Sequence, residues 1–244
     1  MNLKIGIISG CTSDYFDRML VLYKSLRQFH KDIYFIAYMI GNNDSEIEKD
    51  NELKQIYEKK EDNYLIYKQD IIKFENINHK RGYSVNIRIN YLLENFKDYD
   101  CLFWMDADTI ILKNIQSLFD KFNKYKVLVY SHRENFRKIL NSNIGFRKCK
   151  KTNYILKNWF NEMKNKGHMN WKWFDDQKML EKYLHLALEK YSHQKEFCYK
   201  MPKYYTSWST IITNKTYIII GKGKKKNGNK YLENQNTILN NYKK

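Results

Sequence analysis

The sequence predicts a single-domain α/β fold in which helices flank a mixed sheet. Short apolar segments alternate with segments of helical period along most of the chain, and one apolar segment runs directly into Asp106 and Asp108. Alternation of this kind is typical of sheets covered by helices, whose strand ends face a crevice. The chain has 244 residues, of which 43% are hydrophobic and 16% aromatic, so it can close one sizeable core.

The first hundred residues begin with a strand, a helix and a second strand, a βαβ opening. Residues 43–45 (Asn, Asp, Ser) form a cap that favours a helix start. The expected elements are strands over 4–9, 32–40 and 63–71, and helices over 15–30, from 43 onward, and over 83–96.

The alternation continues to about residue 188, and residues 204–220 have the composition of strand or loop. The expected elements are strands over 101–105, 126–131 and 143–148, and helices over 115–123 and 153–164. We therefore expect one domain over residues 1–220. Residues 221–244 hold seven lysines with little hydrophobic period, which predicts a basic tail or late loop.

Several protein classes are excluded by composition. No apolar run is long enough for a signal segment or a membrane span, so the protein is expected to be soluble, unexported and cytoplasmic. The four cysteines stand far apart without a CxxC pair, which argues against a disulfide scaffold or a zinc module.

The net charge of +17 comes from 37 Lys and only 7 Arg. Readers of bases and phosphates rely on the bidentate Arg fork, so a solvated lysine surface is favoured over a polyanion groove, and no specific nucleic acid is expected. The basic tail is the segment expected to make peripheral contact with a membrane or another phosphate-bearing surface.

The most informative segment is FWMDADTIIL, in which a hydrophobic strand ends at Asp106 and Asp108. In extended chain the side chains of residues i and i+2 share one side, so both carboxylates can face one ligand. Oxygen ligands suit Mg²⁺ or Mn²⁺, which takes one or two protein carboxylates and completes its shell with water and diphosphate oxygens. The alternative is a helix cap at Asp106 and a solvated turn at Asp108.

This segment resembles the DxD motif of GT-A glycosyltransferases, and three further segments in the family's order strengthen the resemblance. They are the opening KIGIISGCTSDYFDRMLVLYKSL, the strand NSNIGFRK and the helix start FDDQKML. Families 8 and 34 are the most similar. The resemblance covers about the first three quarters of the chain and implies a Rossmann-like mixed sheet of GT-A type.

The resemblance implies a metal-dependent hexosyl- or pentosyltransferase. Its donor would be a nucleotide sugar, a UDP- or GDP-sugar, and its acceptor a hydroxyl of a glycan, glycolipid or glycoprotein. Mn²⁺ or Mg²⁺ would be held by Asp106 and Asp108, with Asp106 on the metal shell or the ribose. A cation there would offset the charge of the departing diphosphate.

The resemblance also implies roles for residues outside the DxD motif. The loop after the first strand would lie against base and ribose, Arg88 would approach the nucleotide, and Lys80 and Arg81 would close over the donor. The alternatives are an ordinary βα turn for the loop, a solvated helix arginine for Arg88 and an exposed basic loop for Lys80 and Arg81. Asn143 would bond sugar hydroxyls and Gly145 would let the ligand approach the backbone, although a β-bulge explains this glycine equally well. The expected nucleotide-facing loop residues are Ser9, Gly10, Cys11 and Thr12.

Asp175, Asp176 and Gln177 follow the aromatic residues Trp171, Trp173 and Phe174. Aromatic faces and carboxylates together bind pyranose rings, so this segment is expected to hold the acceptor. Asp176 or Asp175 would be the catalytic base if the enzyme inverts the anomeric centre, and Gln177 would contact substrate. The alternative is a helix N-terminus enriched in Asp because of the macrodipole.

Some alternatives remain open at this level. His168 or His193 would supply a third metal ligand by analogy with related enzymes, but their neighbours do not distinguish them from surface histidines. A metal-dependent nucleotidyltransferase also places acidic pairs at strand ends, but it usually adds a glycine-rich phosphate loop, and GCTSDYF has one Gly. A non-enzymatic polyanion-binding domain would use only the positive charge.

Overall fold

The structure is a computed structural model, which describes residues 3–48, 52–131, 139–190, 197–202, 205, 207–208, 213–221, 236–237 and 240. Most of the expected basic tail, residues 221–244, and His193 therefore lie outside the described residues. None of the described helices is long and apolar enough to cross a bilayer.

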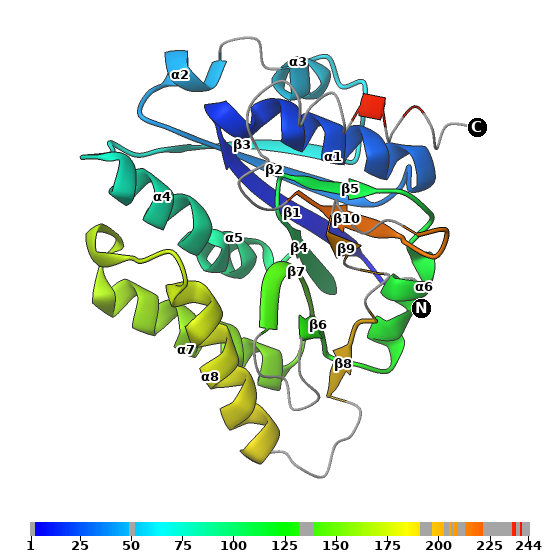
Figure 1. The fold of residues 1–244 in the computed structure, drawn as a ribbon, viewed down its shortest axis with the longest axis vertical. Coiled ribbons are helices and arrows are strands. Elements are labelled where there is room, and N and C mark those ends of the chain that lie inside the picture. The colour runs from blue at the N-terminus through cyan, green and yellow to red at the C-terminus, as the bar shows by residue number, and fades with distance from the viewer. Residues whose placement is uncertain are drawn as a thin grey trace.

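Within the described residues, the central sheet has seven strands in the order β3-β2-β1-β4-β7-β6-β8 (Figure 1). Strands β3, β2, β1 and β4 are mutually parallel, and β7 runs antiparallel to both β4 and β6. The strands are β1 Ile5–Thr12, β2 Tyr34–Gly41, β3 Leu65–Ile71, β4 Cys101–Met105, β6 Val127–Ser131, β7 Ile139–Arg147 and β8 Cys198–Lys200. The expected mixed sheet is confirmed.

A smaller sheet of three described strands lies beside the end of β4, in the order β5-β10-β9. Its strands are β5 Thr109–Ile111, β9 Ser207–Trp208 and β10 Ile218–Ile220. The chain therefore leaves β4 at Met105, turns through Asp106–Asp108, and enters a second sheet at Thr109.

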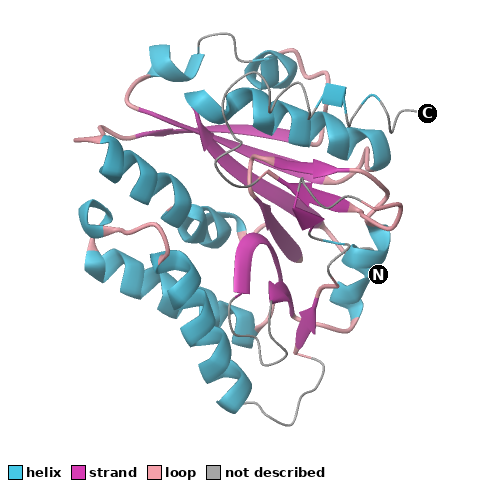
Figure 2. Ribbon diagram, viewed as in Figure 1, coloured by secondary structure: helices cyan, strands magenta, loops and turns pink. Residues whose placement is uncertain are grey.

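Helices cover both faces of the central sheet (Figure 2). One face packs on α1, α3 and α6, and its core includes Met19, Leu22 and Phe103. The other face packs on α4, α5, α7 and α8, and its core includes Leu102 and Trp159. The described helices are α1 Phe16–Phe29, α2 Asp44–Glu48, α3 Glu52–Glu58, α4 Ile77–Asn86, α5 Arg88–Asn95, α6 Gln116–Phe119, α7 Lys150–Lys166 and α8 Asp175–Lys190, with 3₁₀ turns η1 Ser13–Tyr15, η2 Asp120–Asn123 and η3 His168–Asn170.

One expected helix boundary is wrong. The sequence predicts a helix over residues 83–96, but the structure has α4 from Ile77 and α5 from Arg88. The reason is a local cap, because the side chain of Asn76 accepts hydrogen bonds from the amides of Asn78 and His79 and starts the helix a turn and a half earlier. The early start places α4 beside the strand ends.

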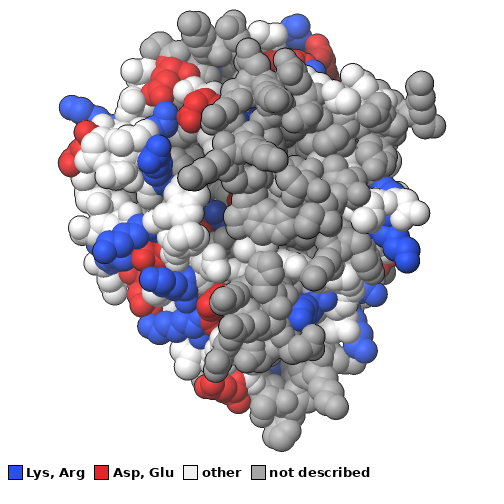
Figure 3. All heavy atoms as spheres, in the orientation of Figure 1, with Lys and Arg blue, Asp and Glu red and all other residues white. Residues whose placement is uncertain are grey.

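Charged side chains of both signs lie on the face of the molecule in Figure 3. On the described part of the face in Figure 3, Lys and Arg side chains are interspersed with Asp and Glu. No continuous basic groove is seen among the described residues of this face.

Candidate active site

A cleft of about 580 Å³ opens at the carboxyl ends of β1 and β4. In the described chain, β1 lies between β2 and β4, so the strand order reverses at this point and leaves a crevice of the kind in which α/β proteins bind ligands. The residues that line it are Gly10, Cys11, Thr12, Asp14, Tyr15, Ile77, Lys80, Arg81, Ser84, Val85, Arg88, Trp104, Asp106, Ala107, Asp108 and Trp173.

Asp106 and Asp108 both line this cleft, as the sequence predicts, but not in extended chain. The amide of Asp106 donates to Ser142 O at 2.8 Å, and the amide of Thr109 donates to Asp106 O at 3.0 Å, so the segment is a tight turn. The amide of Gly221 donates to Asp108 O at 2.8 Å and ties the turn to the end of β10. The backbone fixes both carboxylates at the cleft.

The carboxylate of Asp106 has two strong partners. Its Oδ1 accepts from Trp104 Nε1 at 2.7 Å and lies 3.3 Å from a terminal guanidinium nitrogen of Arg88. The Arg88 guanidinium also lies over the Trp104 ring, 5.1 Å from its centroid. These contacts restrict the orientation of Asp106.

Arg88 lines the cleft, but it is buried, with 4% of its surface exposed. Its Nε lies 2.9 Å from Asp176 Oδ2, so one guanidinium contacts both Asp106 and Asp176. Arg88 is therefore a cation between two carboxylates, and its fork positions the acidic groups.

The structure separates Asp175 from Asp176. Asp175 pairs with Lys166 and accepts from the amide of Lys172 at 2.6 Å, so its carboxylate holds the turn that leads into α8. Asp176 is 2% exposed and faces Arg88. Burial raises the pKa of the Asp176 carboxyl to about 6, because the opposing effects of Arg88 and the Gln177 amide are smaller.

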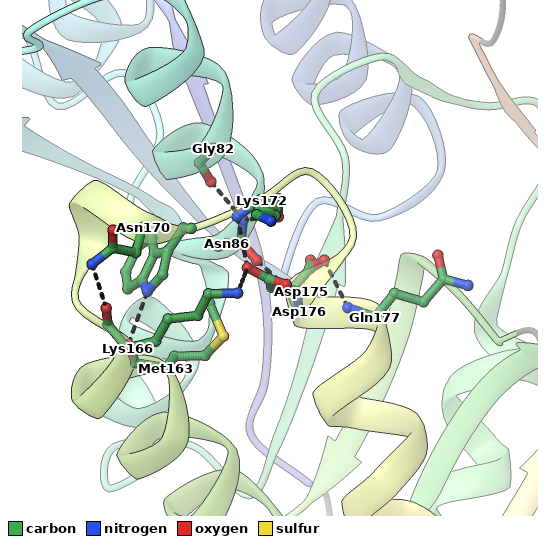
Figure 4. Close-up of polar contacts among 10 residues, drawn as sticks. Gly82, Asn86, Met163, Lys166, Asn170, Lys172, Asp175, Asp176 and Gln177 are labelled. Carbon is green, nitrogen blue, oxygen red and sulfur yellow. Dashed lines mark hydrogen bonds and ion pairs between the residues drawn. The ribbon is translucent and has the colours of Figure 1, made fainter.

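Gln177 and His168 are not among the residues that line the cleft. The amide of Gln177 donates to Asp176 Oδ1, and the Gln177 side chain extends away from Asp175 (Figure 4). His168 Nδ1 lies 3.0 Å from His79 Nε2. Among the described residues, no group of three or more His, Cys, Asp or Glu side chains could hold a metal ion.

The expectation that residues 9–12 form a loop is wrong, while their contact with a nucleotide stays a prediction. Strand β1 continues through Thr12 because its backbone pairs with β2 up to Ile40, so alternate side chains point to opposite faces. Ser9 is fully buried, and the Cys11 thiol faces Met39 Sδ at 3.7 Å. Burial raises the pKa of this thiol well above its usual range, while Gly10, Cys11 and Thr12 still border the cleft.

Close packing of aromatic rings explains why residue 145 is a glycine. A Cβ at this position would lie 2.6 Å from Phe122 Cζ and 2.7 Å from Phe103 Cδ2, so only glycine fits between these rings. Asn143 is fully buried and lies 3.5 Å from Thr109 Oγ1. Neither residue is part of the cleft lining.

Asp14 is a cleft residue that the sequence did not single out. Its Oδ1 accepts from Thr12 Oγ1 at 2.5 Å and lies 3.3 Å from Lys80 Nζ. Burial alone would raise the pKa of the Asp14 carboxyl, but the Thr12 hydroxyl and Lys80 outweigh it and lower the pKa. The sequence signal that could have identified Asp14 is the short connection between the first strand and the first helix, because it places residues near position 14 at the end of the strand.

Comparisons with known proteins identify the fold. No family model and no curated protein match the chain. Solved structures do match, among them a glycosyltransferase involved in glycosylation of the major capsid of PBCV-1, with a TM-score of 0.55 and 12% identity over 96% of this chain and 98% of that chain. The chain has a glycosyltransferase fold.

Two further similar structures are larger proteins. The glycosyltransferase GlyE of Streptococcus pneumoniae TIGR4 matches with a TM-score of 0.60 and 12% identity, over 99% of this chain and 63% of that chain. The bifunctional glycosyltransferase WbbM matches with a TM-score of 0.62 and 13% identity, over 99% of this chain and 50% of that chain. These similarities confirm the expected fold, a mixed sheet flanked by helices in one domain.

Proposed function

We propose that this chain is a metal-dependent glycosyltransferase that moves a sugar from a nucleotide-sugar donor to an acceptor hydroxyl. The observation that carries the proposal is the pair Asp106 and Asp108, held by a backbone turn at the cleft where β1 and β4 end. The similarity to glycosyltransferases in fold supports the same class of reaction.

The donor set at the turn fits a divalent cation. Asp106 and Asp108 are carboxylates on one cleft wall, and Mg²⁺ or Mn²⁺ commonly takes only one or two protein carboxylates beside substrate phosphates. The described cleft lining has equal numbers of acidic and basic side chains, with Asp14, Asp106 and Asp108 against Lys80, Arg81 and Arg88. A bound diphosphate would make this cleft negative, and a divalent cation would offset that charge.

The proposal gives Asp106, Asp108, Arg88 and Trp173 separate roles in the reaction. When bound, the cation would act as a Lewis acid toward the charge that develops on the leaving diphosphate. Asp108 and Asp106 would hold it, while Arg88 would keep Asp106 oriented. Trp173, which is 54% exposed at the cleft, would offer an apolar face to the acceptor sugar.

The test is a screen of UDP- and GDP-sugars for hydrolysis with and without Mn²⁺. We expect Mn²⁺-dependent release of nucleoside diphosphate, and Asp108→Ala should abolish Mn²⁺-dependent binding of UDP or GDP in calorimetry while the circular dichroism spectrum stays unchanged. Release of diphosphate from a nucleoside triphosphate, but from no nucleotide sugar, would indicate a nucleotidyltransferase instead. Unchanged affinity in Asp108→Ala would contradict the proposed metal site.

A further inference from the structure

Residues 171–176, which lead from η3 into the first turn of α8, are attached to α4 through Asn86 (Figure 4). Asn86 is fully buried. Its Nδ2 donates to Lys172 O at 2.9 Å and to Gly82 O of its own helix at 2.6 Å. Its Oδ1 accepts from the amide of Asp176 at 2.8 Å. One side chain therefore bonds both ends of the segment that carries Trp173 and Asp176.

The same face of α4 admits the segment at close range. Gly82 lies one helical turn before Asn86, and a Cβ on Gly82 would lie 2.3 Å from Trp171 O. Glycine is therefore required for the segment to approach α4 closely enough to reach the Asn86 amide. Gly82 and Asn86 form one docking face, with a steric part and a hydrogen-bonding part.

The docked segment contributes to the cleft in two ways. Trp173 lines the cleft directly, whereas Asp176 lies outside the lining and contacts Arg88, which in turn contacts Asp106. Further contacts of the segment come from α7, through Lys166 to Asp175 and through Trp171 Nε1 to Met163 O. The Tyr83 ring of α4 also stacks on Trp171, with the ring centroids 5.6 Å apart. Of the side chains on α4 and α7 that contact this segment, Asn86 is the one that accepts a hydrogen bond from the Asp176 amide.

We propose that Asn86 is a positioning residue, which fastens residues 171–176 to α4. It thereby keeps Asp176 in contact with Arg88 and keeps Trp173 at the cleft. Asn86 acts through Asp176 and Trp173. The kinetic half of this inference rests on the proposed function, and the structural half does not.

The chain offers a matched control in Asn95, on the neighbouring helix α5. Asn95 is 3% exposed, and its Nδ2 donates to Tyr38 Oη at 2.8 Å and to Tyr91 O at 2.7 Å. Its Oδ1 accepts from Lys68 Nζ. Asn95 is thus buried like Asn86 and its side chain also makes three hydrogen bonds, but none of them is to residues 171–176.

The experiment compares Asn86→Ala with Asn95→Ala by hydrogen exchange and mass spectrometry on the full chain. We expect Asn86→Ala to speed exchange of the amides in peptides covering residues 172–177 on the order of tenfold or more, while Asn95→Ala leaves these peptides at the wild-type rate. If exchange is unchanged in Asn86→Ala, or equally raised in both variants, the attachment is refuted.

A second variant tests the same attachment without removing a hydrogen-bonding group. Alanine is the better helix former, so Gly82→Ala would stabilise an unobstructed helix. We expect it instead to speed exchange of residues 172–177, because its Cβ would push Trp171 away from α4. If Asn86→Ala does not fold, Gly82→Ala alone tests whether residues 171–176 are attached to α4. Exchange at the wild-type rate in Gly82→Ala would contradict the close packing of Trp171 on Gly82.

The kinetic readout is hydrolysis of the UDP- or GDP-sugar that the donor screen identifies. Asn86→Ala should lower kcat on the order of tenfold to a hundredfold while KM for the donor stays within a few-fold, and Asn95→Ala should change neither constant by more than a few-fold. Faster exchange with unchanged kcat would overturn the positioning role. If the wild-type chain hydrolyses no nucleotide sugar, the proposed function fails, and the exchange data still decide whether Asn86 holds the segment.

Discussion

Arg88 on α5 and Asp176 on α8 form a buried ion pair, with Nε of the arginine 2.9 Å from Oδ2 of the aspartate. Only 5% of the Arg88 side chain and 2% of the Asp176 side chain are exposed. The same guanidinium reaches Asp106 at the end of β4. One cation therefore joins the first turn of α8 to the strand end at which the proposed metal would bind.

Removal of Arg88 should destabilise the chain strongly, because it leaves buried Asp176 without its cation. We expect Arg88→Leu to lower the free energy of unfolding by about 3–5 kcal/mol near neutral pH, measured by urea denaturation. Arg88 lowers the pKa of Asp176, so its loss raises that pKa and lets Asp176 become neutral in mild acid. The loss of stability should therefore be smaller at about pH 5 than at about pH 7.5.

The control for this prediction is Arg81→Leu. Arg81 lies on the exposed side of α4 and has no ion pair among the described residues. Its substitution should change the free energy of unfolding by less than about 0.5 kcal/mol. Equal losses in the two variants would mean that the buried pair contributes nothing specific.

Gly145→Ala should separate packing from ligand binding at β7. Its Cβ would overlap the rings of Phe103 and Phe122, so we expect a loss of about 1–3 kcal/mol in stability with no change in UDP or GDP affinity. Gly145→Ala combined with Phe122→Leu should recover part of the loss, because the smaller side chain makes room. A lower nucleotide affinity at unchanged stability would favour the ligand-facing role instead.

Much of the fold is encoded in local patterns. Strand β4 was predicted at its observed bounds because an apolar run stands between two aspartates, Asp100 and Asp106. The position of Asp106 and Asp108 at a strand end also follows from local sequence. The start of α4 was missed because its cap, Asn76, stands well before the amphipathic segment.

The rest of the site depends on contacts between distant residues. Arg88 meets Asp176, and Asn86 meets the Asp176 amide, only after α4, α5 and α8 pack on the same face of the sheet. Asp175 and Asp176 are identical and adjacent in sequence, so only their burial and partners distinguish a helix-start residue from the partner of Arg88. The inward Cys11 thiol could have been expected from alternation if β1 had been extended to Thr12.

The His79 and His168 pair should make stability pH-dependent. The Glu75 amide donates to His79 Nδ1, so the neutral His79 ring carries its proton on Nε2 and donates it to His168 Nδ1. Burial lowers the pKa of His79, and His168 lowers it further. The unfolded chain therefore binds this proton first, and stability should fall as pH decreases below about 6.5.

The measurement is urea denaturation of wild type and His79→Gln between about pH 7.5 and pH 5.5. We expect the stability of wild type to fall more steeply than that of His79→Gln, by up to about 1.4 kcal/mol per pH unit for one proton. Asp176 acts in the opposite direction, since its raised pKa favours the folded state as pH falls toward about 4, but it is present in both proteins and cancels in the difference. If stability depends on pH equally in wild type and His79→Gln, the lowered pKa of His79 does not contribute to the pH dependence.

The last prediction separates the two aspartates at the start of α8. Asp176→Asn should lower kcat for sugar transfer on the order of a hundredfold or more, because it removes the carboxylate that pairs with Arg88, while the affinity for UDP or GDP with Mn²⁺ stays within a few-fold. If the ionised form is required, wild-type kcat should fall as pH decreases through about 6, the pKa that burial gives this carboxyl. Steady-state kinetics across this range are the measurement.

Asp175→Asn is the matched control, since it also replaces one buried carboxylate by an amide in the same helical turn. Asp175 binds Lys166 and the Lys172 amide, so its substitution should lower stability by about 1–3 kcal/mol and leave kcat within a few-fold of wild type. Loss of turnover in Asp175→Asn together with wild-type turnover in Asp176→Asn would reverse the two roles. Wild-type turnover in both variants would remove this turn of α8 from the chemistry, because neither carboxylate could then act on the transferred sugar, directly or through Arg88.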